Sequence, residues 1–135
     1  MSIENILKQI WKRSPVCVRN LILSIMSSRI GTHDPKAPES PLYVLGAFAS
    51  SSGLAEGARL YAAARRREGR EVICLDITQA MRQRTDLKES LDGVVAFESR
   101  NMLSLLGTIV VHANPPQFQL VLLKLGSEFL RNKRI

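Results

Sequence analysis

One stretch of the chain, GAFASSSGLAEGARL at residues 46–60, constrains the fold more than any other. It follows a short apolar run at residues 42–45 and leads into a segment whose apolar residues recur at helical spacing. A strand that passes into a helix through glycine and serine is the junction at which α/β proteins bind phosphate groups. A second apolar run at residues 71–77 completes a strand–helix–strand unit.

The alternation of strand and helix patterns continues to the end of the chain. Residues 93–97 are expected to form a short strand, residues 102–106 a short helix or turn, and the polar residues 78–91 a short helix and a loop. A β-branched strand at residues 107–112 precedes a helix with the stripe Phe118, Val121, Leu122, Leu125 and Phe129. The order predicts an α/β fold, a Rossmann-like parallel sheet flanked by helices. Because residues 133–135 look like the opening of another strand, we expect the domain, residues 42–135, to be incomplete at its C-terminus, with a small complete sheet as the alternative.

The first 30 residues form a basic amphipathic helical extension, interrupted at Pro15. Residues 31–41 contain Pro35, Pro38 and Pro41 and are expected to be a linker. Apolar burial together with basic attraction would let residues 1–30 lie on an anionic membrane surface. The alternative is an extension that packs on its own domain or on another one.

The chain has 135 residues, 45% of them hydrophobic, which is enough for one domain with a core. Its net charge of +7 invites a nucleic-acid interpretation. Much of the excess charge, however, falls at predicted helix ends, where cations stabilise the helix dipole. These basic residues are Arg65, Arg66, Arg67 and Arg70, and then Arg131, Lys133 and Arg134. No aromatic residues are interleaved with these runs, so we expect no nucleic-acid partner.

Cys17 and Cys74 are far apart in sequence and have no metal-type spacing, so neither a disulfide framework nor a zinc site is predicted. Cys74 falls within a strand and is expected to be a core residue. The apolar run at residues 21–26 is much shorter than the roughly 20 residues that cross a bilayer. We expect no signal peptide, no membrane-spanning helix, no metal and no cofactor. The expected location is the cytoplasm, with peripheral contact at the inner membrane surface if residues 1–30 bind lipid.

The serine-rich loop is the first candidate site. Backbone amides near a helix start could hold a diphosphate, and glycine at position 53 allows close approach. Ser51 or Ser52 could equally be only a helix N-cap. A carboxylate at Glu56 opposes an anion there unless its side chain turns away or binds sugar hydroxyls. We weigh a phosphate-contacting loop against a purely structural turn.

His112 ends a predicted strand at the carboxyl edge of the sheet, where α/β proteins bind ligands, so it could face the loop at residues 51–53 across one crevice. Its alternative role is to bond the loop backbone. Asn114 is expected to cap the last helix, with Pro115 at the first helical position.

A dinucleotide site is the alternative for the same junction. Gly46, Gly53 and Gly57 do not fall in the Gly-x-Gly-x-x-Gly spacing. Asp76, however, ends the second strand about 20 residues on, where a ribose-binding acid belongs. An NAD(P)-binding oxidoreductase therefore stays open as an alternative.

Residues 43–76, with SSSGLAEGARL and then VICLDIT, together with VVHANPPQF at residues 110–118, resemble the N-terminal, acceptor-side half of bacterial GT-B glycosyltransferases of the retaining, glycogen-synthase-like superfamily. The resemblance implies sugar transfer from a nucleotide-sugar to a polysaccharide or envelope acceptor. The residues that it implicates are the diphosphate-facing loop Ser51, Ser52, Gly53, Leu54 and Glu56, the reacting-centre residue His112, and Asn114 on the acceptor side.

In that family the donor-binding half carries the phosphate contacts and a pair of glutamates. The resemblance covers only the other half, so it implies that this chain alone is inactive. A third reading is non-enzymatic, a membrane-surface or partner-binding module led by residues 1–30.

Overall fold

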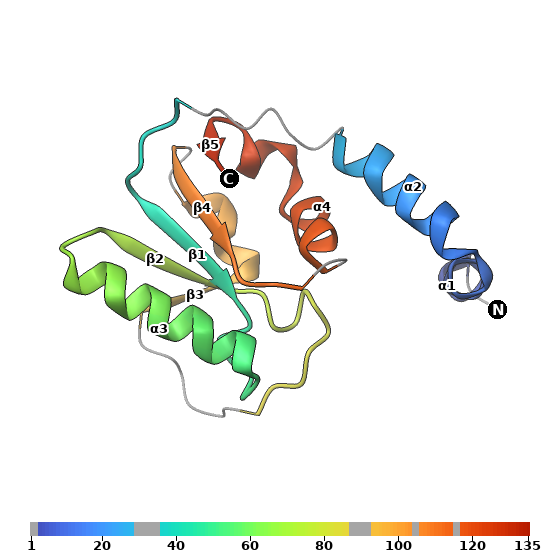
Figure 1. Ribbon diagram of the computed structural model, residues 1–135, viewed down its shortest axis with the longest axis horizontal. Coiled ribbons are helices and arrows are strands. Elements are labelled where there is room, and N and C mark those ends of the chain that lie inside the picture. Colours follow the sequence, from blue (N-terminus) through green and yellow to red (C-terminus); the bar gives the residue numbers. More distant parts are fainter. Residues whose placement is uncertain (1–2, 29–35, 87–92, 104–105, 115–116) are drawn as a thin grey trace.

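The protein is described here by a computed structural model that covers residues 3–28, 36–86, 93–103, 106–114 and 117–135. Five parallel strands form one sheet in the order β3–β2–β1–β4–β5 (Figure 1). The strands are β1 Leu42–Gly46, β2 Val72–Asp76, β3 Val94–Ala96, β4 Gly107–Val111 and β5 Lys133–Arg134. The predicted Rossmann-like α/β fold is confirmed, and this strand order is that of dinucleotide-binding sheets.

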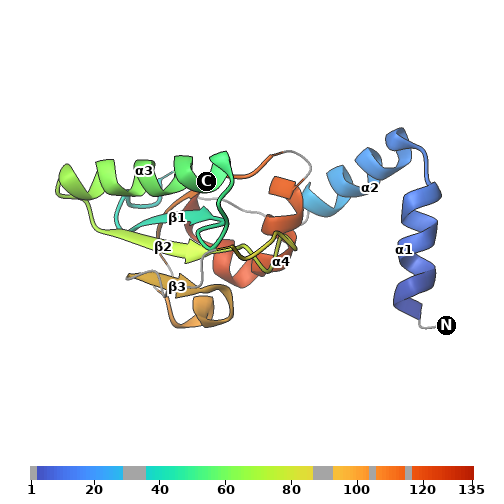
Figure 2. The same cartoon turned by 90° about the horizontal axis from the view of Figure 1, so that it is seen from below.

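Helices cover both faces of the sheet. Helix α3 (Gly53–Arg67) and helix α4 (Gln117–Leu130) lie on opposite sides of it (Figure 2). Side chains alternate along β1, so that Val44 packs toward α3 and Tyr43 toward α4. The predicted apolar stripe of α4 lies in the core on its side of the sheet. This stripe is Phe118, Val121, Leu122, Leu125 and Phe129.

Gly46 allows α3 to approach β1 closely. A Cβ atom added at Gly46 would lie 2.5 Å from the Cβ of Ala58, far inside van der Waals contact. The sequence analysis assigned close approach to Gly53, but the glycine that determines helix–sheet packing is Gly46 at the strand end. A Cβ at Gly53 would meet nothing within 4 Å.

The C-terminal segment differs from its sequence interpretation at Lys133. We expected a strand to open at residues 133–135, and β5 lies there, but we also expected Lys133 to be one of the helix-end cations, whereas it is fully buried in β5. Its Nζ donates a hydrogen bond to the Phe129 carbonyl at 2.7 Å and lies 4.1 Å from the centre of the Phe129 ring and 5.3 Å from that of Tyr43. Because burial disfavours the charged form, the pKa of Lys133 falls to about 8.

Three weaker predictions change in detail. The short helix expected at residues 102–106 is a 3₁₀ helix, η1, earlier in the chain at Phe97–Met102. Residues 78–82 form turns rather than the expected short helix, residues 83–86 form an irregular loop, and residues 87–91 lie outside the described part. Helix α4 contains a kink at Gly126, where φ is 81°, which the apolar stripe did not indicate. Pro115, expected at the first helical position, also lies outside the described residues.

The N-terminal extension consists of two helices, α1 (Ile3–Arg13) and α2 (Val16–Ser28), with the expected break at Pro15. Helix α2 contacts α4, and the pair projects away from the sheet (Figures 1 and 2). Residues 29–30 of the expected extension and residues 31–35 of the expected linker lie outside the described part. Beyond them Ala37 is buried, and the Thr108 hydroxyl donates a hydrogen bond to the Pro38 carbonyl. Within the described residues, no helix has both the length and the apolar content to cross a bilayer.

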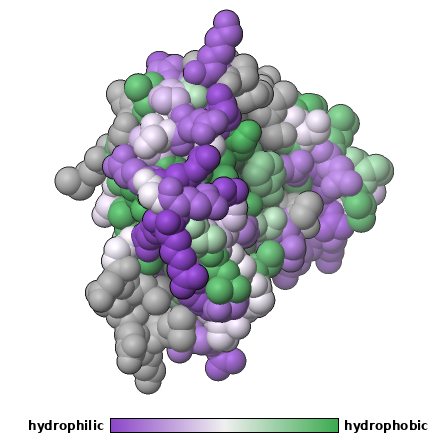
Figure 3. Space-filling view, turned by 60° about the vertical axis from the view of Figure 1, so that its left-hand side comes forward, coloured by the Kyte–Doolittle hydropathy of each residue, from purple (hydrophilic) through white to green (hydrophobic). Residues whose placement is uncertain are grey.

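The face of the molecule that carries the C-terminal end of α3 is largely hydrophilic (Figure 3). Arg65, Arg66 and Arg67 occupy the last turn of α3, as predicted for cations that stabilise a helix end. Arg65 bonds Glu68 at 2.8 Å and lies over the Tyr61 ring. Arg65 is thus engaged within its own helix end, whereas Arg66 donates to the Val72 carbonyl and to Cys74 Sγ of β2.

Candidate functional site

The order of the strands creates a switch point between β1 and β4. The chain leaves β1 toward α3 on one face and leaves β4 toward α4 on the other, so the two connections diverge at the carboxyl edge. The amide of His112 donates to the Leu45 carbonyl at 2.8 Å, which joins the two strand ends. In open α/β sheets such a divergence leaves the crevice in which ligands bind.

The loop after β1 ends in a well-formed helix cap. The side-chain oxygen of Ser52 accepts a hydrogen bond from the Ala55 amide at 3.3 Å, which makes Ser52 the N-cap of α3. The hydroxyl of Ser50 accepts one from the Ser52 amide at 3.2 Å. Within the described residues, the amides of Gly53 and Leu54 have no acceptor. Two donors at the positive end of a 15-residue helix are therefore open to a ligand.

A buried threonine connects this loop to the end of β2. The amide of Ala49 donates to Thr78 Oγ1 at 3.2 Å, and the Thr78 hydroxyl donates to Asp76 Oδ1 at 2.5 Å. The Thr78 amide bonds the same carboxylate oxygen at 3.1 Å. Asp76, the candidate ribose-binding acid, thus has one carboxylate oxygen engaged in organising its own turn. Sequence reasoning missed Thr78 because its role depends on contact between two separate loops.

Asp86 is a second residue that the sequence did not single out. Its Oδ2 accepts hydrogen bonds from the Ser51 hydroxyl at 2.8 Å and from the Ser51 amide at 3.4 Å. The hydroxyl bond, with help from the amide, lowers the pKa of Asp86 below its ordinary value. Ser51 is therefore occupied by a carboxylate of this chain, 35 residues further on. Of the predicted loop residues, Gly53 and Leu54 are better placed to receive an anion.

Arg59 forms an ion pair with the carboxylate of Glu56. Its Nε lies 2.9 Å from Glu56 Oε2, and its Nη1 donates to the carbonyls of Phe48 and Ser50 at 2.9 and 3.1 Å. The charge of Glu56 is thus partly balanced within α3, which weakens the objection that it would repel an anion. The spacing of Glu56 and Arg59, three residues apart on one helix, is the sequence signal that could have indicated this pair.

His112 follows β4 directly and packs against α3. Its ring lies 5.3 Å from that of Tyr61, and its Nδ1 would be 3.9 Å from a Cβ at Gly57. Its Nε2 is shielded from solvent and has no hydrogen-bond partner among the described residues. Burial lowers the pKa of His112, so the imidazole is neutral near neutral pH. The ring of His112 thus lies against the second and third turns of α3, at Gly57 and Tyr61, and among the described residues no hydrogen bond joins it to Ser51 or Ser52.

Asn114 is exposed, and its carbonyl accepts a hydrogen bond from the Phe118 amide at 3.0 Å. This bond starts α4 as the expected cap would, although through the backbone. Asn114 stands two residues after His112, on the connection that leaves the same sheet edge.

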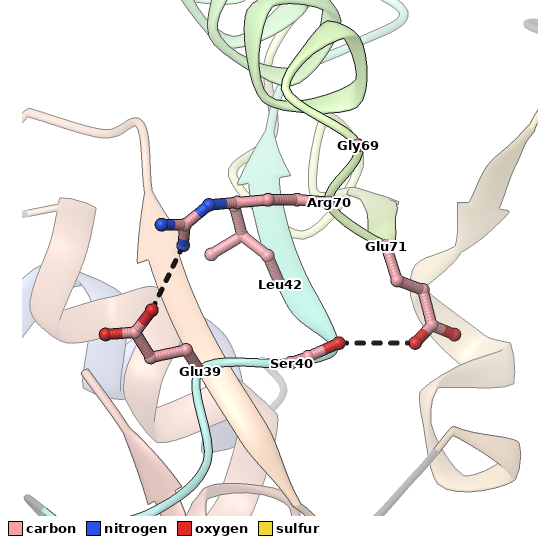
Figure 4. A pocket seen from close by; sticks show the side chains of 6 residues that line it. All are labelled: Glu39, Ser40, Leu42, Gly69, Arg70 and Glu71. Atoms are coloured by element: carbon pink, nitrogen blue, oxygen red, sulfur yellow. Dashed lines mark hydrogen bonds and ion pairs between the residues drawn. The ribbon is translucent and has the colours of Figure 1, made fainter.

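A separate pocket of about 320 Å³ lies at the opposite, amino edge of the sheet (Figure 4). Arg70 reaches across it to Glu39 at 3.4 Å, and the Ser40 hydroxyl bonds Glu71, also at 3.4 Å. Its charged side chains are largely exposed and already pair with one another, so the contacts fix the start of β1 against the turn after α3. Among the described residues, no group of three or more His, Cys, Asp or Glu side chains could hold a metal ion.

The chain matches no family model, no curated protein and no solved structure. The fold and the geometry of the carboxyl edge are therefore the physical basis for a functional proposal. The two strongest features there are the open amides of Gly53 and Leu54 and the unpartnered nitrogen of His112.

Proposed function

We propose that this chain is the acceptor-side domain of a retaining GT-B glycosyltransferase that uses a nucleotide-sugar donor and a polysaccharide or envelope acceptor. The observation that carries the proposal is the shielded Nε2 of His112 at the carboxyl end of β4, which has no hydrogen-bond partner in the part of the chain that the structure describes. A buried polar atom left without a hydrogen bond costs about 1–3 kcal/mol, so a ligand that supplies the bond regains that free energy.

Sugar hydroxyls match this nitrogen chemically. A neutral imidazole can donate or accept one hydrogen bond, as a hydroxyl can, and the lowered pKa of His112 keeps the ring neutral. The Tyr61 ring packed against His112 adds an apolar surface to the imidazole. These features support a sugar-contacting role for His112, with Asn114 on the adjacent connection as a further contact.

The start of α3 supports the diphosphate part of the proposal. The amides of Gly53 and Leu54 are without acceptors and stand at the positive end of the helix dipole. Because residue 53 is glycine, it has no side chain that would block the approach of a ligand to these amides. Ser52 contributes by capping the helix, and Ser51 by holding the preceding backbone through Asp86. In the proposed enzyme, these groups face a nucleotide-sugar whose remaining phosphate contacts come from a second α/β domain.

Calorimetric titration of the chain with UDP-, GDP- and dTDP-linked hexoses, free oligosaccharides and NAD tests this assignment. We expect saturable binding of a sugar-containing ligand that weakens about tenfold in His112→Ala, which corresponds to the loss of about 1.4 kcal/mol. The matched control is Arg67→Gln, an exposed position at the far end of α3, which should bind as the unchanged chain does.

The pH dependence provides a second readout. Because the pKa of His112 is lowered, affinity should be constant from about pH 8 down to the ordinary imidazole pKa and fall only below it. Saturable NAD binding that Asp76→Ala abolishes and His112→Ala leaves intact would instead establish the oxidoreductase alternative. Absence of any sugar-ligand binding that depends on His112 would refute the proposal.

A further inference from the structure

The two N-terminal helices carry large apolar side chains that the rest of the molecule leaves uncovered. Helix α2 contacts α4 and buries Leu23, yet most of the large aliphatic residues of the pair face outward. We refer to these exposed residues together as the N-terminal apolar surface. They are Ile6, Ile10, Trp11, Val16, Val18, Leu21, Ile22 and Ile25, which are 37% to 62% exposed.

Basic residues stand next to members of this surface in the sequence of both helices. Lys12 and Arg13 form the last turn of α1 directly after Trp11, and half-buried Arg19 belongs to the first turns of α2. The sequence of residues 3–28 contains four basic residues, the three already named and Lys8, against the single acid Glu4. A partner for this surface therefore has to combine an apolar layer with negative charge.

An anionic lipid bilayer has both properties. Apolar side chains enter the acyl boundary while lysine and arginine remain among the headgroups, and tryptophan prefers the level between them. With 11 and 13 residues, each helix is shorter than the roughly 20 residues of a span, so both would lie along the interface. The positive charge of the segment disfavours a second copy of this chain, and lysine is depleted at protein interfaces.

We propose that the N-terminal apolar surface binds the surface of an anionic membrane, with α1 and α2 lying in the headgroup region. This inference goes beyond the proposed sugar transfer and does not depend on it. It positions the α/β domain next to the bilayer, because α2 packs on α4.

Trp11 is the only tryptophan of the chain and reports directly on the event. The experiment uses the whole chain and mixed vesicles of phosphatidylglycerol and phosphatidylcholine at about 0.1 M salt. We expect a blue shift of the Trp11 emission and sedimentation with the vesicles. Both signals should be lost on vesicles of phosphatidylcholine alone and should weaken strongly at about 1 M salt.

Three variants distinguish binding by the N-terminal apolar surface from nonspecific adsorption through any exposed apolar residue. Ile10→Glu removes one exposed apolar contact and should weaken binding about tenfold. Lys12→Gln retains the helix and the apolar face and should weaken binding to anionic vesicles about fivefold. The matched control Leu60→Glu alters a residue of α3 that is 63% exposed, outside the surface, and should bind normally.

Three results would overturn the inference. The first is an unshifted Trp11 emission with anionic vesicles, and the second is equal weakening by Ile10→Glu and Leu60→Glu. The third is a blue shift that grows with protein concentration in the absence of lipid and disappears in Ile10→Glu, which would assign the surface to a second copy of the chain. None of these results would affect the sugar-binding proposal, whose residues lie in the α/β domain.

Discussion

At the scale of single residues, the contact between Gly46 and Ala58 determines how closely α3 approaches the sheet. A methyl group at Gly46 would lie 2.5 Å from the Ala58 Cβ, and both residues are buried. We expect Gly46→Ala to lower the free energy of unfolding by about 1–3 kcal/mol through overpacking. Urea denaturation of Gly46→Ala measures this.

The control for this prediction is Gly53→Ala, which adds the same methyl group where nothing lies within 4 Å and should be nearly neutral. Combining Gly46→Ala with Ala58→Gly should restore part of the loss, short of the roughly 1 kcal/mol that a glycine costs inside a helix. A double variant no more stable than Gly46→Ala would show that the clash is not the cause.

Lys133 predicts an unusual dependence of stability on pH. The pKa of its buried ammonium is about 8 in the folded protein, against 10.5 for an ordinary lysine. The unfolded chain therefore binds more protons between these values, so the free energy of unfolding should rise by up to about 3 kcal/mol as pH increases through that window. Below about pH 8 the full penalty remains.

Chemical denaturation at several pH values tests this, with Lys133→Met as the comparison. The methionine variant lacks the titrating group, so its stability should change less with pH across the same window. Parallel curves for the two proteins would show that Lys133 titrates as an ordinary lysine.

At the scale of elements, the loop between β1 and α3 is held by Thr78. Replacing its hydroxyl in Thr78→Val leaves the Ala49 amide and the Asp76 carboxylate without their shared partner. We expect the free energy of unfolding to fall by about 1–3 kcal/mol, the usual cost of a buried hydrogen-bonding group that loses its partner. The matched variant Thr108→Val removes an exposed hydroxyl bonded to the Pro38 carbonyl and should cost less than 1 kcal/mol. Thermal unfolding of both variants measures these changes. Equal losses of stability in Thr78→Val and Thr108→Val would contradict the role given to Thr78.

Helix α4 allows a complementary test at Gly126. Its φ of 81° is a conformation that residues with a side chain avoid, whereas an added Cβ would meet nothing within 4 Å. We expect Gly126→Ala to destabilise the protein by about 1–3 kcal/mol through backbone strain alone. Denaturant midpoints measure the change, and a neutral substitution would mean that α4 straightens at this point.

The elements that the sequence predicted best are those whose signal is local. The N-cap at Ser52 and the stripe of α4 depend on residues within one helix, and both occur. The bond between Ser51 and Asp86 could not be predicted, because it joins a loop to a polar segment without periodicity. For the same reason His112 could be assigned to a sheet edge, while its packing on Tyr61, which depends on how α3 crosses β4, could not.

At the scale of the whole molecule, the alternation of elements was sufficient to predict a parallel sheet but not its strand order. The order β3–β2–β1–β4–β5 depends on which crossover goes to which face of the sheet. Strands β2 and β3 are added on one side of β1, and β4 and β5 are added on its other side. That arrangement places His112 against α3 at Gly57 and Tyr61, although these residues are far from His112 in sequence. The sequence indicated the strand that opens at Lys133 but not the burial of its side chain, which depends on packing against Tyr43 and Phe129.

We propose that the ligand of this domain contains a sugar and binds at the carboxyl edge of the sheet. Backbone amide shift mapping by NMR during titration with nucleotide-sugars and oligosaccharides tests it most directly. We predict the largest changes at Gly53, Leu54 and His112. Changes centred on Glu39 and Arg70 at the opposite edge, or no saturable change with any sugar ligand, would contradict it.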